Sequence, residues 1–143
     1  MTETRTAPYA ALLLRLSLGA LFLAHAGVKF FVFTPEGTAR FFGSLGLPPV
    51  VAYIVLLGEV LGGLALIVGI WTRPVALALV PILLGAIATV HGPAGFLFSN
   101  PQGGWEFPAF WIVALIALSL LGDGAYALKI SRGNPALANP ARA

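Results

Sequence analysis

The sequence predicts an all-α integral membrane protein: a bundle of four membrane-spanning helices with both termini in the cytoplasm. Hydrophobic residues make up 59% of the 143-residue chain and charged residues 9%, and the mean hydropathy is +0.95. A soluble domain carries about a quarter charged residues, so this chain is too apolar to coat a soluble globule. Four apolar segments of about 20 residues fill most of residues 1–128, which we interpret as one membrane domain. Residues 129–143 are expected to form a flexible cytoplasmic tail.

Stretches rich in glycine and proline separate the four predicted spans. The first of these, residues 34–49, contains Pro35 and Pro48-Pro49 and is expected to be a loop rather than a helix. Pro81 lies inside the third span and predicts a kink there. The predicted spans are residues 9–33, 50–70, 75–91 and 106–122.

Basic residues are distributed unevenly around these spans. Arg5, Arg73 and the basic residues of the tail fall on one side, whereas the loops of the other side hold only Arg40. Because positively charged loops stay in the cytoplasm, this pattern places both termini there. The net charge of +3 comes from scattered residues and does not indicate nucleic-acid binding.

The polar residues inside the spans form two layers, one near each membrane face. Arg15 and Asp123 fall at similar depths near the predicted cytoplasmic face, where a long arginine side chain reaches toward the interface. Charged groups are costly inside a bilayer, so they normally find partners within the protein. We therefore expect Arg15 and Asp123 to form a structural ion pair.

The outer layer draws on all four spans and is the stronger functional candidate. His25 and Lys29 are four residues apart, so they lie one above the other on the first span. Glu59 is a carboxylate in the middle of the second span, where a charge costs about 2.5–3.5 kcal/mol, and Lys29 is the nearest cation. The candidates for ligand binding or proton exchange are His25, Lys29, Glu59, His91, Trp105 and Glu106.

The same residues also allow purely structural roles. An ion pair between Lys29 and Glu59 would fix the register of two helices, and both histidines would fill ordinary hydrogen-bonding positions. The chain has no cysteine and no strong metal-ligand spacing, so the sequence predicts no metal site. Haem bound between His25 and His91 is a less favoured alternative.

Short motifs follow one another in a fixed order along the four spans. They are Arg15-Leu16, Gly19, Leu21-Phe22-Leu23, His25, Gly27, Lys29-Phe30, Gly58-Glu59, Gly62-Gly63, Thr72-Arg73, His91, Gly95-Phe96 and Gly103-Gly104-Trp105-Glu106-Phe107-Pro108. This series, over about residues 12–125, resembles the DoxX family of small bacterial membrane proteins. Ala26 stands where the family usually has a glycine, a change that leaves the polar positions intact.

The resemblance implies a multi-pass protein of the bacterial cytoplasmic (inner) membrane. Its relatives are linked to quinone-coupled sulfur oxidation, terminal oxidase modules and oxidative or thiol stress. Because the chain has no cysteine and no recognisable flavin or nucleotide motif, we expect a subunit that works with a redox partner protein rather than a free-standing enzyme. Its many glycines would also allow it to form a homo-oligomer.

The leading hypothesis for function is a pocket in the outer half of the bundle that binds a quinone or another small polar-headed molecule. His25 and Lys29 would bind the headgroup oxygens, and Trp105 would stack on the ring. Glu59 or Glu106 would exchange protons. The alternatives are a transporter of small molecules or lipids and a membrane scaffold without a ligand.

Overall fold

The computed structural model describes residues 5–128, which form helices joined by turns and loops. The elements are α1 (Ala7–Gly27), η1 (Val28–Val32), α2 (Pro35–Ser44), α3 (Val50–Val68), α4 (Thr72–Ala86), η2 (Ile87–His91) and α5 (Glu106–Leu121), where η marks a π-helical turn. The predicted fold class, an all-α membrane protein, is confirmed. The predicted tail, residues 129–143, lies outside the described residues.

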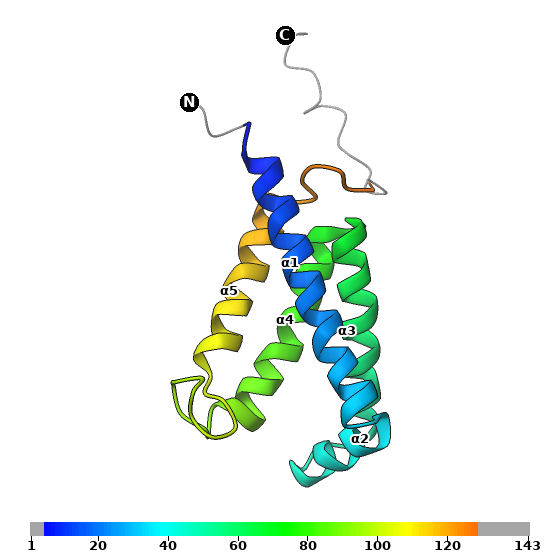
Figure 1. Cartoon of the computed structure of the whole chain (residues 1–143), viewed down its shortest axis with the longest axis vertical. Helices are drawn as coiled ribbons and strands as arrows, with labels where there is room; N and C mark the ends of the chain where they lie inside the picture. The colour runs from blue at the N-terminus through cyan, green and yellow to red at the C-terminus, as the bar shows by residue number, and fades with distance from the viewer. Residues whose placement is uncertain (1–4, 129–143) are drawn as a thin grey trace.

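Helices α1, α3, α4 and α5 form a bundle in which each packs on its neighbours. α1 packs on α3, α3 on α4 and α4 on α5, and α5 also contacts α1. The pair α1–α3 and the pair α4–α5 lie close together where α1 begins and separate toward α2 (Figure 1). We call the first the closed end, with residues 122–128, and the second the open end, with η1, α2 and η2.

Three helical segments of the described chain are long and apolar enough to cross a membrane. The fourth predicted span corresponds to α5, an apolar helix of 16 residues that is about 24 Å long, against about 30 Å for a bilayer core. Local thinning of the bilayer accommodates such a helix. The three longer segments are Ala7–Val32, Val50–Val68 and Thr72–His91.

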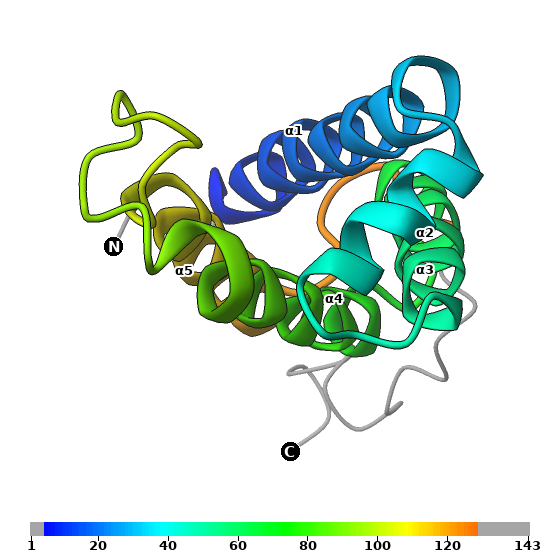
Figure 2. The same ribbon diagram turned by 90° about the horizontal axis from the view of Figure 1, so that it is seen from below.

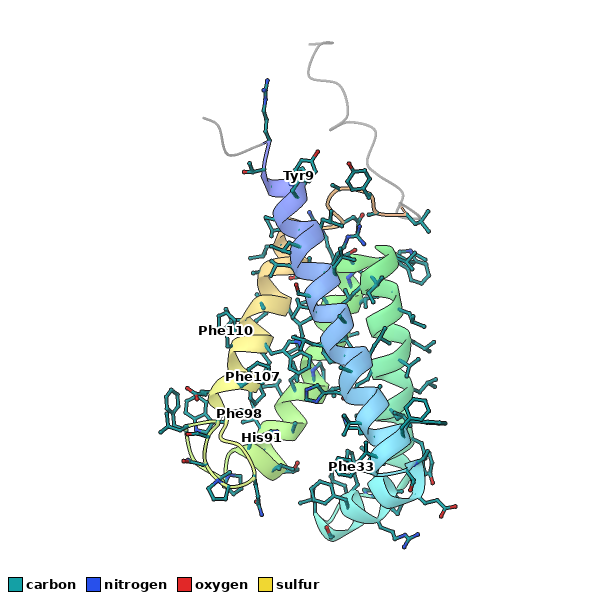
Figure 3. All side chains as sticks on the ribbon, viewed as in Figure 1. Tyr9, Phe33, His91, Phe98, Phe107 and Phe110 are labelled. Atoms are coloured by element: carbon teal, nitrogen blue, oxygen red, sulfur yellow. The ribbon has the colours of Figure 1, made fainter. Side chains whose placement is uncertain are left out.

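The outer surface of the bundle is apolar, as contact with lipid requires. α3 exposes a row of aliphatic side chains at helical spacing, and on α5 the exposed side chain of Phe110 points away from the other helices (Figure 3). The row on α3 consists of Ile54, Leu57, Leu61 and Leu64. Buried side chains such as Phe22, Leu66 and Leu115 fill the interior.

The start of α1 and the segment after α5 meet at the closed end. The N–H of Ala125 donates to the carbonyl of Pro8 at 2.9 Å, and the N–H of Leu128 donates to the carbonyl of Val68 at 3.1 Å. Both ends of the described chain therefore lie at the same end of the bundle (Figure 1). Which end faces the cytoplasm stays a prediction.

Arg15 caps the C-terminal end of α3 inside the closed end. Its Nη1 donates to the carbonyl of Leu66 at 3.2 Å and also to that of Ile67. Its Nη2 donates to the carbonyl of Ala125 at 2.8 Å. The last carbonyls of a helix have no partners within the helix, and a cation is favourable beside them. Arg15 therefore holds α1, the end of α3 and the segment after α5 together.

The direct ion pair predicted between Arg15 and Asp123 is not present. Among residues 5–128 the ion pairs are Lys29–Glu59 and Glu36–Arg40. Asp123 attracts the guanidinium only through its charge. The physical reason is that the terminal guanidinium nitrogens of Arg15 are already held by backbone carbonyls at the end of α3 and by that of Ala125.

Glycines bring α1 and α3 into backbone contact one helical turn from this cap, toward the open end. A Cβ atom added at Gly19 would lie 2.7 Å from the carbonyl oxygen of Gly63 and the same distance from the side chain of Ile67. On the other side of α3, a Cβ atom at Gly62 would meet Leu79 of α4 at 2.7 Å. A methyl group at Gly19 would thus collide with the backbone of α3, and one at Gly62 would require the Leu79 side chain to move.

The expectation of a loop over residues 34–49 was wrong, because Pro35–Ser44 forms helix α2. The Thr34 side chain caps this helix by accepting from the N–H of Gly37 at 3.1 Å. Pro35 occupies the first turn, where its missing N–H has no consequence, and Glu36 adds a favourable charge there. α2 packs on α3 and η1 and, seen from below, extends toward α4 (Figure 2).

Candidate functional site

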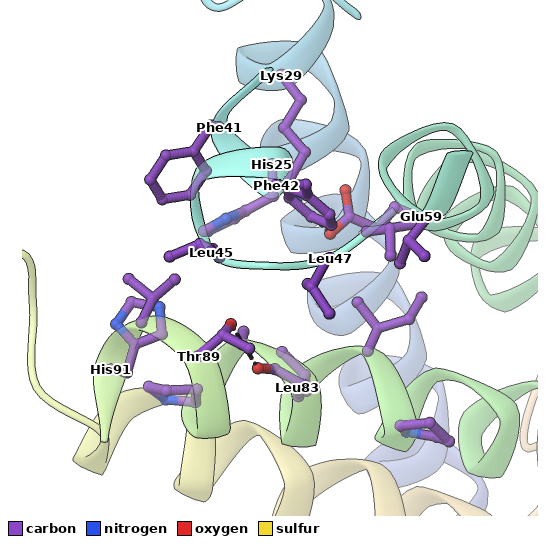
Figure 4. A pocket seen from close by; sticks show the side chains of 18 of the residues that line it. His25, Lys29, Phe41, Phe42, Leu45, Leu47, Glu59, Leu83, Thr89 and His91 are labelled. Atoms are coloured by element: carbon purple, nitrogen blue, oxygen red, sulfur yellow. Dashed lines mark hydrogen bonds and ion pairs between the residues drawn. The ribbon is translucent and has the colours of Figure 1, made fainter. Parts of the chain in front are cut away.

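A cavity of about 390 Å³ lies between the two helix pairs at the open end. Side chains from α1, α3, α4 and α5 form its walls, and α2 with the turn that follows it contributes one side (Figure 4). Most of the lining is apolar, with Phe42, Leu47, Val55, Leu83 and Phe107 among the residues that contribute to it. Small-molecule sites in proteins are typically of ~300–1,000 Å³ and mostly apolar, with a few polar groups.

An ion pair between η1 and α3 forms part of the cavity wall. Lys29 Nζ lies 2.5 Å from Glu59 Oε1, which confirms the predicted pairing of these residues. The Glu59 side chain is 5% exposed and that of Lys29 is 21% exposed. The second carboxylate oxygen, Glu59 Oε2, is buried and has no hydrogen-bond partner among residues 5–128.

His25 and Trp111 form a second polar part of the wall. The two rings meet edge-on with their centroids 5.1 Å apart. Trp111 also packs against Phe22 at 4.7 Å and Phe107 at 5.7 Å, and it is 4% exposed. Its Nε1, which can only donate, is buried without a hydrogen-bond partner in the described part of the chain.

His91 is the last residue of the π-helical turn η2 and lines the cavity on the side opposite Glu59 (Figure 4). Its Nδ1 lies 2.7 Å from the carbonyl oxygen of Gly103. Since a carbonyl only accepts, this contact assigns a proton to Nδ1, and a neutral ring then keeps Nε2 as an acceptor. Lys29 lies in the other π-helical turn, η1. Such turns are rare and frequently occur at functional sites, so two of them beside one cavity support a functional role for this end.

Helix α2 is connected by a hydrogen bond to the backbone of Lys29, one member of the ion pair. Thr38 Oγ1 lies 3.2 Å from the carbonyl oxygen of Lys29 and 2.9 Å from that of Thr34, so its hydroxyl donates to this pair of acceptors. Thr38 is buried, and the neighbouring rings of Phe41 and Phe42 line the cavity. The position of α2 is therefore linked directly to the backbone beside the ion pair.

Two of the six predicted site residues do not line this cavity. Trp105 packs on Phe96 with the ring centroids 4.8 Å apart. Glu106 Oε1 accepts from the N–H of Phe98 at 2.8 Å, and Glu106 borders a separate hollow with Phe107. Both residues hold the loop between η2 and α5 in place. The other four, His25, Lys29, Glu59 and His91, all line the cavity.

Trp111 and helix α2 contribute to the cavity but were not among the residues and elements predicted from the sequence. Tryptophan in a span usually lies at the membrane interface. Trp111 lies well inside the apolar segment, about 8 Å beyond the start of α5, and this unusual depth was the available signal. Within residues 5–128, no three His, Asp or Glu side chains are grouped so that they could hold a metal ion.

These features define a small helical membrane protein with an amphipathic cavity between its helices. The DoxX family model matches residues 10–92. A protein of Bacillus subtilis (strain 168) named "Putative oxidoreductase CatD" is 38% identical over 117 residues, which cover 82% of this chain and 82% of that protein. The chain therefore belongs to the DoxX family. No solved structure matches it.

Proposed function

We propose that this protein is the membrane subunit of a bacterial inner-membrane redox system and that its cavity binds a quinone or a closely related ring compound. The observation that carries the proposal is one cavity in which apolar walls meet the Lys29–Glu59 ion pair and two histidines. The name of the Bacillus subtilis relative supports the redox class.

The size and lining of the cavity support a ring compound with an apolar substituent. An apolar cavity of about 150 Å³ is enough to hold benzene. The cavity of about 390 Å³ therefore has room for a substituted ring and the first part of a hydrocarbon tail. Phe41, Phe42 and Phe107 supply aromatic and apolar surface for both parts.

In this function each polar residue has a separate role. Lys29 and His25 donate hydrogen bonds to the ring oxygens, and Glu59 exchanges protons as the ring is oxidised or reduced. Trp111, rather than Trp105, packs beside the ring. The chain has no cysteine with which to carry electrons, so a partner protein supplies or removes them.

The test is to identify what the protein retains when it is purified in mild detergent. Extracted small molecules are identified by mass spectrometry, and an absorbance spectrum is recorded for the wild type, Glu59→Gln and His25→Ala. We expect the wild type to retain a quinone or its reduced form and both variants to retain less of it. Glu36→Gln is the matched control, because Glu36 is a surface carboxylate paired only with Arg40 and its loss should not change retention.

The other outcomes distinguish the alternative functions. Circular dichroism first establishes that each variant is folded. A folded wild type that retains no ring compound, and binds none when one is added, overturns the proposal and favours a scaffold. Retained lipid in place of a quinone favours lipid handling. A haem absorbance band would instead assign His25 and His91 to iron.

A further inference from the structure

Two residues that line the cavity each carry a buried polar atom without a hydrogen-bond partner in the described chain: Glu59 at Oε2 and Trp111 at Nε1. Each of these residues is 4% exposed and lines the cavity. Buried polar groups in proteins nearly always have a partner, and leaving one unpaired is costly. An occupant that reaches these atoms would therefore have to carry the groups that they lack.

The oxygen of Glu59 requires a donor. Lys29 Nζ already occupies Oε1 at 2.5 Å, and a carboxylate in an ion pair accepts hydrogen bonds but does not donate them. The protein offers Oε2 no N–H or O–H group within residues 5–128. A ligand that satisfies it must therefore bring an N–H or O–H group of its own.

The nitrogen of Trp111 requires an acceptor. The indole N–H can only donate, and its ring is held by aromatic contacts with Phe22, His25 and Phe107. These contacts prevent the ring from turning toward another acceptor without losing buried packing. The occupant must therefore also bring an oxygen or nitrogen lone pair.

Hydroxyl groups on a ring satisfy both requirements, because a hydroxyl donates through its hydrogen and accepts through its oxygen. A quinone carbonyl can only accept, so it would leave Glu59 Oε2 unpaired. We propose that the cavity selects the reduced, hydroxyl-bearing form of its ring ligand over the carbonyl form, with Glu59 accepting from the hydroxyl and Trp111 donating to the ligand. This inference rests on the proposed function and names the form of the ligand that the site prefers.

The preference is measured with three probes that share one ring and one decyl tail: the hydroquinone, its dimethyl ether and the benzoquinone. Binding to the full chain in nanodiscs is followed anaerobically by calorimetry. A hydrogen bond to a charged group is worth about 10–100-fold in affinity. We expect the hydroquinone to bind tighter than both other probes by about that factor. A tenfold preference would raise the reduction potential of the bound couple by about 30 mV.

Two variants give different patterns. Glu59→Gln replaces an acceptor by an amide that both donates and accepts, so the affinities of the three probes should converge to within about threefold. Trp111→Phe removes the donor, so all three probes should weaken while the preference for the hydroquinone stays. Lys29→Met/Glu59→Gln removes both charges and serves if Glu59→Gln alone does not fold. Glu36→Gln, on the exposed face of α2, is the unchanged control.

The results separate this inference from the proposed function. Equal affinity of the wild type for the hydroquinone and its ether would overturn the preference while leaving ring binding intact. An undiminished preference for the hydroquinone in folded Glu59→Gln would also overturn it, because Glu59 would then not be its cause. Water molecules that satisfy the two unpaired atoms would produce equal affinity for the hydroquinone and its ether. Failure of all three probes to bind the folded wild type would overturn both the preference and the proposed function.

Discussion

The two ends of the bundle each bury one charged side chain but satisfy it in different ways. Arg15 at the closed end is 1% exposed and Glu59 at the open end is 4% exposed. Arg15 donates to backbone carbonyls of α3 and of the segment after α5. Glu59 pairs one oxygen with Lys29 and leaves the other without a partner beside a cavity.

The comparison shows that a buried charge in a membrane helix does not by itself mark a functional site. Arg15 also has an unpaired atom, Nε, but Arg15 does not line the cavity, and glycine contacts pack the helices tightly nearby. What distinguishes Glu59 is the combination of an unpaired atom with space for a ligand. The closed end thus holds the helices together, and the open end is available for chemistry.

The largest effect on stability is expected from breaking the ion pair at the open end. Lys29→Met leaves Glu59 buried without a counter-charge, which should lower the free energy of unfolding by about 3–5 kcal/mol. Lys29→Met/Glu59→Gln should recover most of this loss, because no unpaired charge remains. Unfolding by sodium dodecyl sulfate, followed by circular dichroism, measures both. A double variant as unstable as the single variant would contradict the account.

A smaller loss is expected from removing the cap at the closed end. Arg15→Met keeps much of the side-chain volume but leaves carbonyls of α3 without partners, at about 2–4 kcal/mol in total. Because Arg15 does not contact the cavity, ring binding by the folded variant should stay within about twofold of the wild type. Loss of ring binding with unchanged stability would assign Arg15 to the binding site and contradict the distinction between a structural closed end and a ligand-binding open end.

The smallest effect comes from one methyl group placed at each end. Gly19→Ala forces a Cβ atom against the backbone of α3 at 2.7 Å and should destabilise the protein by about 1–3 kcal/mol. Gly85→Ala adds the same group on α4, where nothing lies within 4 Å, and should be neutral or stabilise by up to about 1 kcal/mol. Thermal unfolding of the two variants side by side tests the difference in packing. Equal losses would show that the open end is packed as tightly as the closed end.

The sequence predicted the polar layer well where residues lie on continuous helical segments, the π-helical turns η1 and η2 included. Depth along a helix follows from residue number, so counting residues along the spans was enough to place His25, Lys29, Glu59 and His91 at similar levels. The same calculation failed for Trp105 and Glu106. These residues end a loop that folds back on itself through backbone hydrogen bonds, for example from Trp105 N–H to the Gly95 carbonyl at 3.0 Å.

Other features depend on contacts that a single sequence does not reveal. Arg15 donates to backbone carbonyls, which every residue carries. The residue types alone therefore could not show that these carbonyls, and not the Asp123 carboxylate, are its partners. Helix α2 was different, because Thr34-Pro35-Glu36 is a typical helix start that glycines and prolines nearby obscured. Recognising this helix start would have predicted a helix at the open end of the bundle.

The most direct test of the central claim is to locate the ligand by photoaffinity labelling. A decyl quinone carrying an azide is illuminated with the wild-type protein in nanodiscs, and the adducts are mapped by mass spectrometry. The account predicts adducts on residues that line the open-end cavity, such as Phe107 and Trp111, which excess unlabelled quinone prevents. Adducts confined to the lipid-facing surface or to the closed end around Arg15, unaffected by competitor, would contradict it.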